Sequence, residues 1–284
     1  MKKIGRRGFI ILTFATFAAI SLGLCRRIFG AKQLRFPYLN KPLPAPEYTA
    51  LAAKPGWSAS RITVAPGISL NGLVRRPQAA DAPWVLFYQG NDAEMLRVGQ
   101  AFLSGLAADR DWGLAIFAYR GYDSSVGEPH LPDLAADAPE IITQLCASEH
   151  LERSKVHVVG FSIGGHIAVR AMAVAARTEP RPASLTLLAP VNDIVMVPRS
   201  FYERLDPGDE FQTAPFLDAV SAPVLVIQGT ADEALGGPEQ GHAIAIKLGS
   251  RARYVELQGV GHIALLSSEK VFAITRDFIT EHIK

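Results

Sequence analysis

Cysteine is scarce in this chain, which has only Cys25 and Cys146 among its 284 residues. Cys25 lies in an N-terminal apolar run, so the folded part cannot contain a disulfide framework. Neither cysteine lies in a metal-binding motif, and the sequence therefore predicts no metal site. We interpret Cys146 as a buried helix residue.

The chain also has no large excess of basic or of acidic residues. The chain has 29 Lys and Arg residues against 27 Asp and Glu residues, which gives a formal net charge of +2. Several of the positive charges lie within the first 35 residues, so the remainder is close to neutral. This balance gives no electrostatic reason to expect nucleic acid as a partner.

One long hydrophobic run is present, from Gly8 to Cys25, with basic residues on both sides. Its 18 uncharged residues lie at the lower edge of the length of a transmembrane helix and exceed the usual apolar part of a signal peptide. We therefore expect residues 1–32 to be a membrane anchor or an export signal. The basic residues ahead of the run favour a domain that faces outward, so we expect a membrane-anchored or exported protein.

Two alternatives stay open for this segment. The pair Arg6-Arg7 before the apolar run resembles a twin-arginine export signal. The stretch from Leu22 to Cys25 resembles a lipoprotein cleavage box, although Leu24 stands where that box has a small residue. Whether the segment is retained, cleaved or lipidated is not decided by these patterns.

Residues 33–58 have little periodic apolar pattern, and we expect an extended linker there. Its prolines are Pro37, Pro42, Pro44, Pro46 and Pro55. From residue 59 to residue 284, short apolar segments alternate with helix-length stretches, which predicts one α/β domain. The sequence contains no evident internal repeat.

The expected strands after "RITVA" and "ISLNGLV" are short, nearly continuous apolar runs, as in strands that are covered on both faces. They cover residues 84–90, 112–119, 155–160, 184–190, 223–229 and 253–259. Helix-like stretches lie near 93–108, 132–149, 164–178, 238–249 and 268–283. This order predicts a mostly parallel central sheet flanked by helices, with chemistry at the carboxyl ends of the strands.

A single serine, Ser162, stands between Gly160 and Gly164 in the stretch VVGFSIGGH. An expected strand ends at Gly160 and an expected helix begins near Ile163, which is the context of a nucleophile elbow. Such an elbow needs glycines on both sides because side chains there would collide with the neighbouring strand and helix. Ser162 is therefore the candidate nucleophile.

A serine hydroxyl needs a base, and the base needs a carboxylate that orients it. With this elbow the acid and then the histidine follow on loops after later strands. Asp232 follows the strand PVLVIQG, and His262 follows the strand RYVELQG. Glu233 and Asp193 compete with Asp232 for the role of the acid, because each also lies just after a strand.

Acyl transfer also needs donors for the oxyanion, which are usually two backbone N–H groups. The first comes from the residue after the serine, Ile163. The second comes from the loop after the strand WVLFYQG, where we expect the backbone of Asn91 to supply it.

Five blocks of the chain carry a family resemblance: VLFYQGNDAE, IFAYRGYDSSVGEP, VVGFSIGGHIA, VLVIQGTADE and GVGHIAL. In this order they resemble motifs of the α/β hydrolases. They are most similar to the serine-aminopeptidase-like branch, which often carries an N-terminal membrane segment. The resemblance spans about residues 60–284 and implies a triad of Ser162, Asp232 and His262 that acts on esters, thioesters or, less often, peptides.

Two residues depart from the pattern of that branch. Gln89 stands where the branch usually has a histidine that braces the oxyanion loop, and Asp92 replaces a small residue. Glutamine can still form hydrogen bonds, so we expect altered tuning and not loss of the loop. A carboxylate that pointed inward would oppose the developing negative charge, so we expect Asp92 to face solvent.

The stretch between the fourth and fifth parallel strands has only some 30 residues, which predicts a small cap and an open pocket. Its aromatic residues could line an acyl pocket or pack onto the sheet, and they are Phe201, Tyr202, Phe211 and Phe216. Arg120, in the loop after residues 112–119, belongs to a pocket wall or pairs with a structural carboxylate.

The sequence thus predicts a serine hydrolase that cleaves small-molecule carboxylic esters or thioesters without a metal or organic cofactor. One alternative is a peptidase or amidase, which needs a carboxylate near the pocket to hold the substrate amine; Asp92, Asp193 and Glu233 are candidates. The other is a non-catalytic binding protein on a hydrolase fold, which Gln89 and Asp92 favour and an intact triad disfavours. The sequence assigns no substrate-binding residues.

Overall fold

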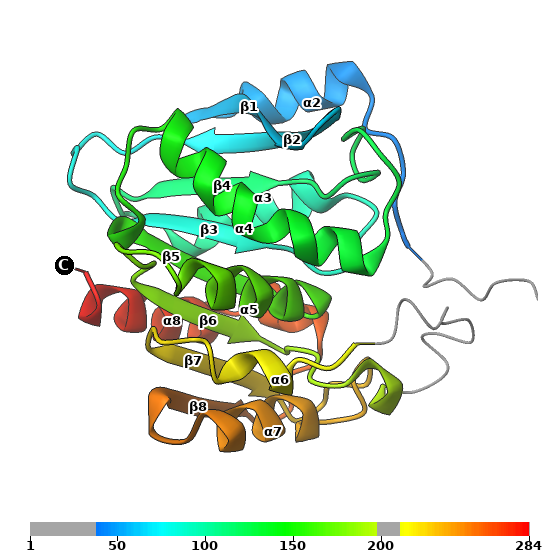
Figure 1. Cartoon of the computed structure of the whole chain (residues 1–284), viewed down its shortest axis with the longest axis vertical. Coiled ribbons are helices and arrows are strands. Elements are labelled where there is room, and N and C mark those ends of the chain that lie inside the picture. Colours follow the sequence, from blue (N-terminus) through cyan, green and yellow to red (C-terminus); the bar gives the residue numbers. More distant parts are fainter. Residues whose placement is uncertain (1–37, 198–210, 284) are drawn as a thin grey trace, which may run out of the picture.

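A computed structural model describes residues 38–197 and 211–283 of the chain (Figure 1). Within these residues eight strands form one sheet, in the order β1-β2-β4-β3-β5-β6-β7-β8. The strands are β1 (Trp57–Ala65), β2 (Ile68–Arg75), β3 (Trp84–Tyr88), β4 (Gly113–Phe117), β5 (Val156–Phe161), β6 (Ser184–Leu188), β7 (Val224–Gly229) and β8 (Ala252–Leu257). Only the β1–β2 and β2–β4 pairs of this sheet are antiparallel, so the predicted α/β class with a mostly parallel sheet is confirmed.

Helices cover both faces of the sheet (Figure 1). The α-helices are α2 (Ala45–Ala52), α3 (Met95–Leu106), α4 (Leu131–Ser148), α5 (Ile163–Ala175), α6 (Ala214–Leu217), α7 (Glu239–Leu248) and α8 (Glu269–Glu281). Helix α4 packs against α5 on one face, and α3 packs against α8 on the other. Short 3₁₀ turns are η1 (Arg153–Lys155), η2 (Ile194–Met196), η4 (Gly249–Arg251) and η5 (Ile263–Ser267).

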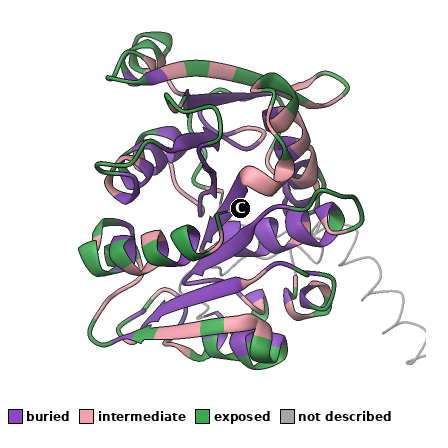
Figure 2. Ribbon diagram, turned by 90° about the vertical axis from the view of Figure 1, so that its left-hand side faces the viewer, coloured by how far each residue is buried: buried purple, intermediate pink, exposed green. Residues whose placement is uncertain are grey.

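The core lies along the central strands, as Figure 2 shows. Every residue of β3, β4, β5, β6 and β7 is buried, whereas the edge strand β8 is partly exposed along its length. Strands that are covered on both faces read as continuous apolar runs. This is why their positions could be predicted from the sequence.

The prediction of an extended linker over 33–58 is wrong from residue 45 onward. Helix α2 begins after Pro44, and Pro46 lies in its first turn, where a missing N–H costs little. Tyr48 of this helix donates its hydroxyl to the carbonyl oxygens of Ser60 (3.0 Å) and Gly72 (2.8 Å). These bonds tie α2 to strands β1 and β2. Residues 33–37 lie outside the described residues.

The predicted anchor, residues 1–32, also lies outside the described residues. Within 38–197 and 211–283, none of the helices combines the length and the apolar character needed to cross a bilayer.

Cys146 lies on α4 and is half-buried, and this burial raises the pKa of its thiol to about 11.

Candidate active site

The chain turns sharply between β5 and α5, at Ser162. Its backbone has φ +56° and ψ −125°, a conformation that side-chain-bearing residues rarely adopt. A Cβ atom at Gly160 would lie 2.7 Å from the carbonyl oxygen of Gly164, and a Cβ atom at Gly164 would collide with the main-chain oxygens of Tyr88 and Gln89. The glycines on both sides of Ser162 are therefore required by the close approach of β3, β5 and α5.

Main-chain hydrogen bonds hold this corner. The N–H of Ser162 donates to the carbonyl oxygen of Leu188 on β6 (3.0 Å), and the Ser162 carbonyl accepts the N–H of Gly165 (2.9 Å). Ser162 is half-buried and immediately precedes the first residue of α5. Its side chain thus lies at the N-terminus of a 13-residue helix, where N–H groups and the helix dipole favour negative charge.

His262 and Asp232 form a hydrogen-bonded pair beyond the ends of β7 and β8. Nδ1 of His262 lies 2.8 Å from Oδ2 of Asp232, and the other oxygen, Oδ1, accepts the N–H of Leu235 (2.9 Å). The Asp232 side chain is fully buried, so the carboxylate faces the imidazole and not solvent. An imidazole that donates Nδ1–H to a carboxylate keeps Nε2 as its acceptor, which is the state of a general base.

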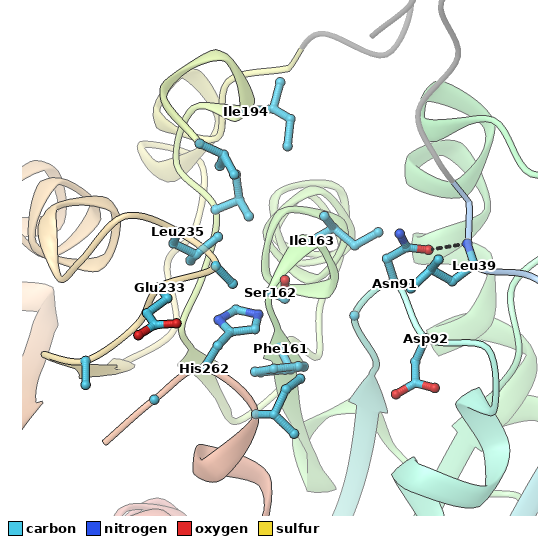
Figure 3. Close-up of a pocket in the computed structure, with 17 residues that line it drawn as sticks. Leu39, Asn91, Asp92, Phe161, Ser162, Ile163, Ile194, Glu233, Leu235 and His262 are labelled. Carbon is cyan, nitrogen blue, oxygen red and sulfur yellow. Dashed lines mark hydrogen bonds between the residues drawn. The ribbon is translucent and has the colours of Figure 1, made fainter. Parts of the chain in front are cut away.

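Ser162 and His262 line the same pocket and lie next to each other in it (Figure 3). The His262 ring packs on Phe161, with 4.7 Å between ring centroids. Ser162, Asp232 and His262 were predicted on loops that follow three different strands. In the structure these loops lie beyond the carboxyl ends of β5, β7 and β8.

The two competing carboxylates, Asp193 and Glu233, do not take the place of Asp232 beside His262. Oδ1 of Asp193 accepts the N–H of Val195 (3.0 Å), and Oδ2 accepts Nε2 of Gln212 (3.1 Å). Glu233 lines the pocket but is exposed. Of these three residues, Asp232 is the one hydrogen-bonded to His262.

Gln228 is a site residue that the sequence analysis did not identify. It lies on β7, is fully buried, and donates from Nε2 to Oδ2 of Asp232 (2.8 Å). The same carboxylate oxygen therefore accepts bonds from Gln228 and His262. The sequence does contain a feature that points to Gln228, because it is the polar residue in the otherwise apolar strand VLVIQG.

The predicted oxyanion residues, Asn91 and Ile163, both line the pocket beside Ser162 (Figure 3). Ile163 is the first residue of α5, and the first N–H groups of a helix have no acceptor within it. The side-chain oxygen of Asn91 accepts the N–H of Leu39 (2.8 Å) and the hydroxyl of Tyr122 (2.7 Å).

Gln89 and Asp92 flank this loop. Gln89 is buried, and its Oε1 accepts the N–H of Gly90 (3.0 Å), so the side chain braces the loop backbone as expected for a hydrogen-bonding replacement. The Asp92 carboxylate points away from Ser162 in Figure 3 and accepts the N–H of Glu94 (2.8 Å). The Asp92 carboxylate is thus directed away from the Ser162 hydroxyl, although both residues line the pocket.

The loop after β4 is held by buried polar contacts. Arg120 pairs with Asp137 on α4 through two bonds of 2.5 and 2.7 Å, so its role is structural. Asp123 is buried and accepts the N–H of Leu96 at the start of α3 (2.6 Å). Burial raises the pKa of the Asp123 carboxyl to about 6.

The pocket has a volume of about 730 Å³ and is mostly apolar. Its apolar lining includes Val191, Ile194, Val197 and Leu235. In Figure 3 Leu39 lies next to Asn91, across the pocket from Leu235. The cap aromatics Phe211 and Phe216 do not line this pocket; they pack on His166 and Arg170 of α5, respectively. Phe201 and Tyr202 lie outside the described residues.

Two other histidines are buried, one within the sheet and one on α5. His157 on β5 lies 2.8 Å from the Ser184 hydroxyl, and His166 on α5 lies 3.0 Å from the Thr213 hydroxyl. Burial lowers the pKa of His157 to about 4 and that of His166 to about 3. Both are therefore neutral structural residues near pH 7.

Over residues 38–197 and 211–283, no group of three potential metal ligands is present.

Known proteins with similar sequences include α/β hydrolases. An uncharacterized protein of Mycobacterium tuberculosis (strain H37Rv) is 27% identical over 276 residues, which is 94% of each chain. Protein bem46 of Schizosaccharomyces pombe is 23% identical and covers 70% of this chain and 68% of its own length. Alpha/beta hydrolase domain-containing protein 17B of Xenopus tropicalis is 26% identical over 70% of this chain and 67% of its own length. No protein-family model matches the chain.

Solved structures of hydrolases share the fold. An esterase of Pyrococcus furiosus superposes with a TM-score of 0.68 at 13% identity and covers 89% of this chain and 99% of its own. Proline iminopeptidase of Mycobacterium smegmatis superposes with a TM-score of 0.61 at 16% identity, over 79% of this chain and 98% of its own.

Proposed function

The chain is an α/β hydrolase by fold, and on that premise we propose that it cleaves carboxylic esters or thioesters through an acyl-enzyme on Ser162. The observation that carries the proposal is the 2.8 Å contact between His262 Nδ1 and Asp232 Oδ2, in a pocket that also contains the strained Ser162. A hydroxyl, an imidazole and a buried carboxylate in this order are the groups that acyl transfer requires.

In the first step His262 Nε2 takes the proton of the Ser162 hydroxyl as Oγ bonds to the substrate carbonyl carbon. The carbonyl oxygen becomes an oxyanion, and the N–H groups of Ile163 and Asn91 are the donors we assign to it. Asp232 holds the Nδ1–H and stabilises the imidazolium. His262 then returns the proton to the leaving alkoxide or thiolate, and the acyl group stays on Oγ.

In the second step water takes the place of the leaving group. His262 removes a proton from the water, hydroxide adds to the acyl carbon, and the bond to Ser162 Oγ breaks as Oγ regains a proton. The products are a carboxylic acid and the free enzyme. The apolar wall of Val191, Ile194 and Leu235 suits an uncharged acyl chain.

Hydrolysis of p-nitrophenyl esters, from acetate to palmitate, tests this function. We expect turnover by the full chain and labelling of it by a fluorophosphonate, which reacts with an activated serine. Both should be lost in Ser162→Ala. A chain that is folded, inactive on all these esters and unlabelled would refute the proposal and favour the non-catalytic binding protein.

A peptidase or amidase is the second candidate, and one observation favours it. Glu233 lines the pocket with an exposed carboxylate that could hold a substrate amine, whereas Asp92 points away and Asp193 is bonded elsewhere. Amino-acid p-nitroanilides test this reading. Faster turnover of these than of esters, lost in Glu233→Gln, would favour the peptidase.

We also propose that residues 1–32 anchor or export the protein and that the hydrolase domain lies outside the cytoplasm. The uncharged run from Gly8 to Cys25 with its basic flanks supports this. Fractionation of cells and protease treatment of intact spheroplasts would test it. A domain that is recovered with the cytosol and is protected from protease would contradict it.

A further inference from the structure

The segment of residues 38–43, here called the strap, lies directly against the oxyanion loop. It has no helix or strand and precedes α2. Hydrogen bonds of Tyr38, Asn40 and Leu43 help to fix its course. The hydroxyl of Tyr38 accepts the N–H of Leu131 (2.7 Å), Nδ2 of Asn40 donates to the carbonyl oxygen of Gly121 (3.1 Å), and the Ser124 hydroxyl bonds the N–H and carbonyl groups of Leu43 (2.9 and 3.0 Å).

The strap and the loop after β4 meet at one atom, the side-chain oxygen of Asn91. It accepts the Leu39 N–H at 2.8 Å and the Tyr122 hydroxyl at 2.7 Å. An amide oxygen has two lone pairs, so these two donors occupy both. The Asn91 side chain is thereby held from two directions by segments that are 52 and 31 residues away in the sequence.

Tyr122 is a rigid support for this bond. Its ring is completely buried and packs edge-on against Tyr119 and Tyr38, with centroid distances of 6.0 and 6.5 Å. Tyr119 in turn donates its hydroxyl to the carbonyl oxygen of Gln89 (2.8 Å), two residues before Asn91. The polar ends of two buried tyrosines thus converge on the loop that follows β3.

Leu39 adds a side chain to the pocket wall. It is 53% exposed and lines the pocket beside Asn91, across from Leu235 (Figure 3). The two parts of Leu39 therefore have separate roles. Its main-chain N–H holds the Asn91 side chain, and its own side chain is placed to contact a substrate in the pocket.

We propose that the strap is part of the active site: with Tyr122 it positions the oxyanion loop through Asn91, and through Leu39 it sets the acyl-length preference. The inference rests on the proposed ester hydrolysis. Tyr122 and Ser124 are positioning residues, because they act through Asn91 and the strap and do not touch the reacting atoms. Leu39 is a specificity-determining residue.

Three substitutions in the full chain separate these roles. Tyr122→Phe removes one donor to Asn91, and Ser124→Ala releases the strap at Leu43. Both should lower kcat on short esters about tenfold or more with little change in KM, since a displaced oxyanion donor acts mainly in the transition state. Leu39→Ala keeps the N–H that holds Asn91 and shortens only the side chain, so its effect should appear in how kcat/KM depends on the length of the acyl chain.

The chain-length profile reports on Leu39. We expect kcat/KM of Leu39→Ala to fall several-fold for longer esters, because the pocket wall loses three carbon atoms against which a longer acyl chain would be buried. Leu39→Met, of similar size, should restore the profile. The matched control is Tyr48→Phe, which removes a hydroxyl bonded to β1 and β2 and should leave both kcat and the profile unchanged.

Wild-type kcat in both Tyr122→Phe and Ser124→Ala would overturn the positioning role, and an unchanged profile in Leu39→Ala would overturn the specificity role. If Tyr122→Phe does not fold, Ser124→Ala still tests the positioning role, because Ser124 is at an exposed position. Fluorophosphonate labelling of the unmodified chain separates the two proposals. An unlabelled, inactive chain refutes the function together with the inference, whereas an active chain with unaffected variants refutes the inference alone.

Discussion

Gln228 donates a hydrogen bond of 2.8 Å to Oδ2 of Asp232, the oxygen that also contacts Nδ1 of His262. The N–H of Leu235 occupies the other oxygen, so the carboxylate is held on three sides by a strand, a loop and the imidazole. A carboxylate that cannot rotate keeps the imidazole in one orientation. Gln228 is thus a support for the triad that lies within the core of the sheet.

Gln228→Leu should lower kcat about 10- to 100-fold with KM unchanged, because a hydrogen bond to a charged group contributes about 1.5–3 kcal/mol. Gln100→Leu is the matched control. Gln100 is equally buried, donates from Nε2 to the carbonyl oxygen of Leu51 (2.8 Å) and lies on α3, away from the pocket. Steady-state kinetics and thermal unfolding of both variants would check the prediction. Equal kcat values in the two would show that Gln228 serves stability only.

Asp232→Asn should lower kcat by about 10⁴, since an amide favours the wrong imidazole tautomer. Asp193→Asn should leave kcat within about twofold of wild type, because its carboxylate bonds Val195 and Gln212 and not His262. Ester hydrolysis over pH 5–9 measures both. A large loss in Asp193→Asn with a small one in Asp232→Asn would reverse the assignment of the acid.

Gly164→Ala should unfold the protein or lower its free energy of unfolding by about 3 kcal/mol, because its Cβ would collide with main-chain oxygens that cannot move aside. Gly67→Ala is the control. Gly67 has φ +75° but nothing within 4 Å of an added Cβ, so only about 1 kcal/mol should be lost there. Urea unfolding followed by circular dichroism would compare them. Similar midpoints for the two variants would contradict the packing argument at the elbow.

Acidification from pH 6.5 to 4.5 should lower the stability of the protein. The pKa values of His157 and His166 are about 4 and about 3 in the folded state against 6.5 unfolded, so the unfolded chain takes up protons that the folded protein does not. The pKa of Asp123 is raised from 3.8 to about 6, so the folded state keeps a proton there and opposes the loss.

Asp123→Asn removes the opposing contribution. The fall in unfolding free energy on acidification should therefore be steeper in this variant, by up to about 1.4 kcal/mol per pH unit. Asp218→Asn, at a carboxylate that is 67% exposed, should keep the wild-type slope. Urea titrations at several pH values measure the slopes. Identical slopes in wild type and Asp123→Asn would refute the role of Asp123.

The elbow and the parallel sheet could be predicted because backbone geometry restricts which residues can occupy them. Only glycine fits at 160 and 164, and strands buried on both faces read as apolar runs. Asp232 was predicted as the acid together with the family resemblance, but its place after a strand did not by itself exclude Asp193, and the three-dimensional contacts distinguish the two. Gln228 was missed because a single polar residue in a strand does not reveal its partner.

The strap was missed for a different reason. Its proline, Pro42, and its lack of apolar periodicity are typical of a linker, and the contacts that hold it come from residues 81 and 93 positions away. Local patterns carry no information about such long-range bonds. The same holds for helix α2, because Pro44 caps it and Pro46 lies in its first turn, where proline is compatible with a helix.

Because Leu39 lies at the pocket, the polypeptide enters the hydrolase domain beside the opening through which a substrate must pass. The 14 residues from Arg26 to Leu39 can span at most about 50 Å. An apolar run inserted in a bilayer would therefore tether the pocket opening within that distance of the membrane surface. Esters dissolved in that membrane would then meet the enzyme at a high local concentration, whereas a chain released from its tether would encounter them only by free diffusion.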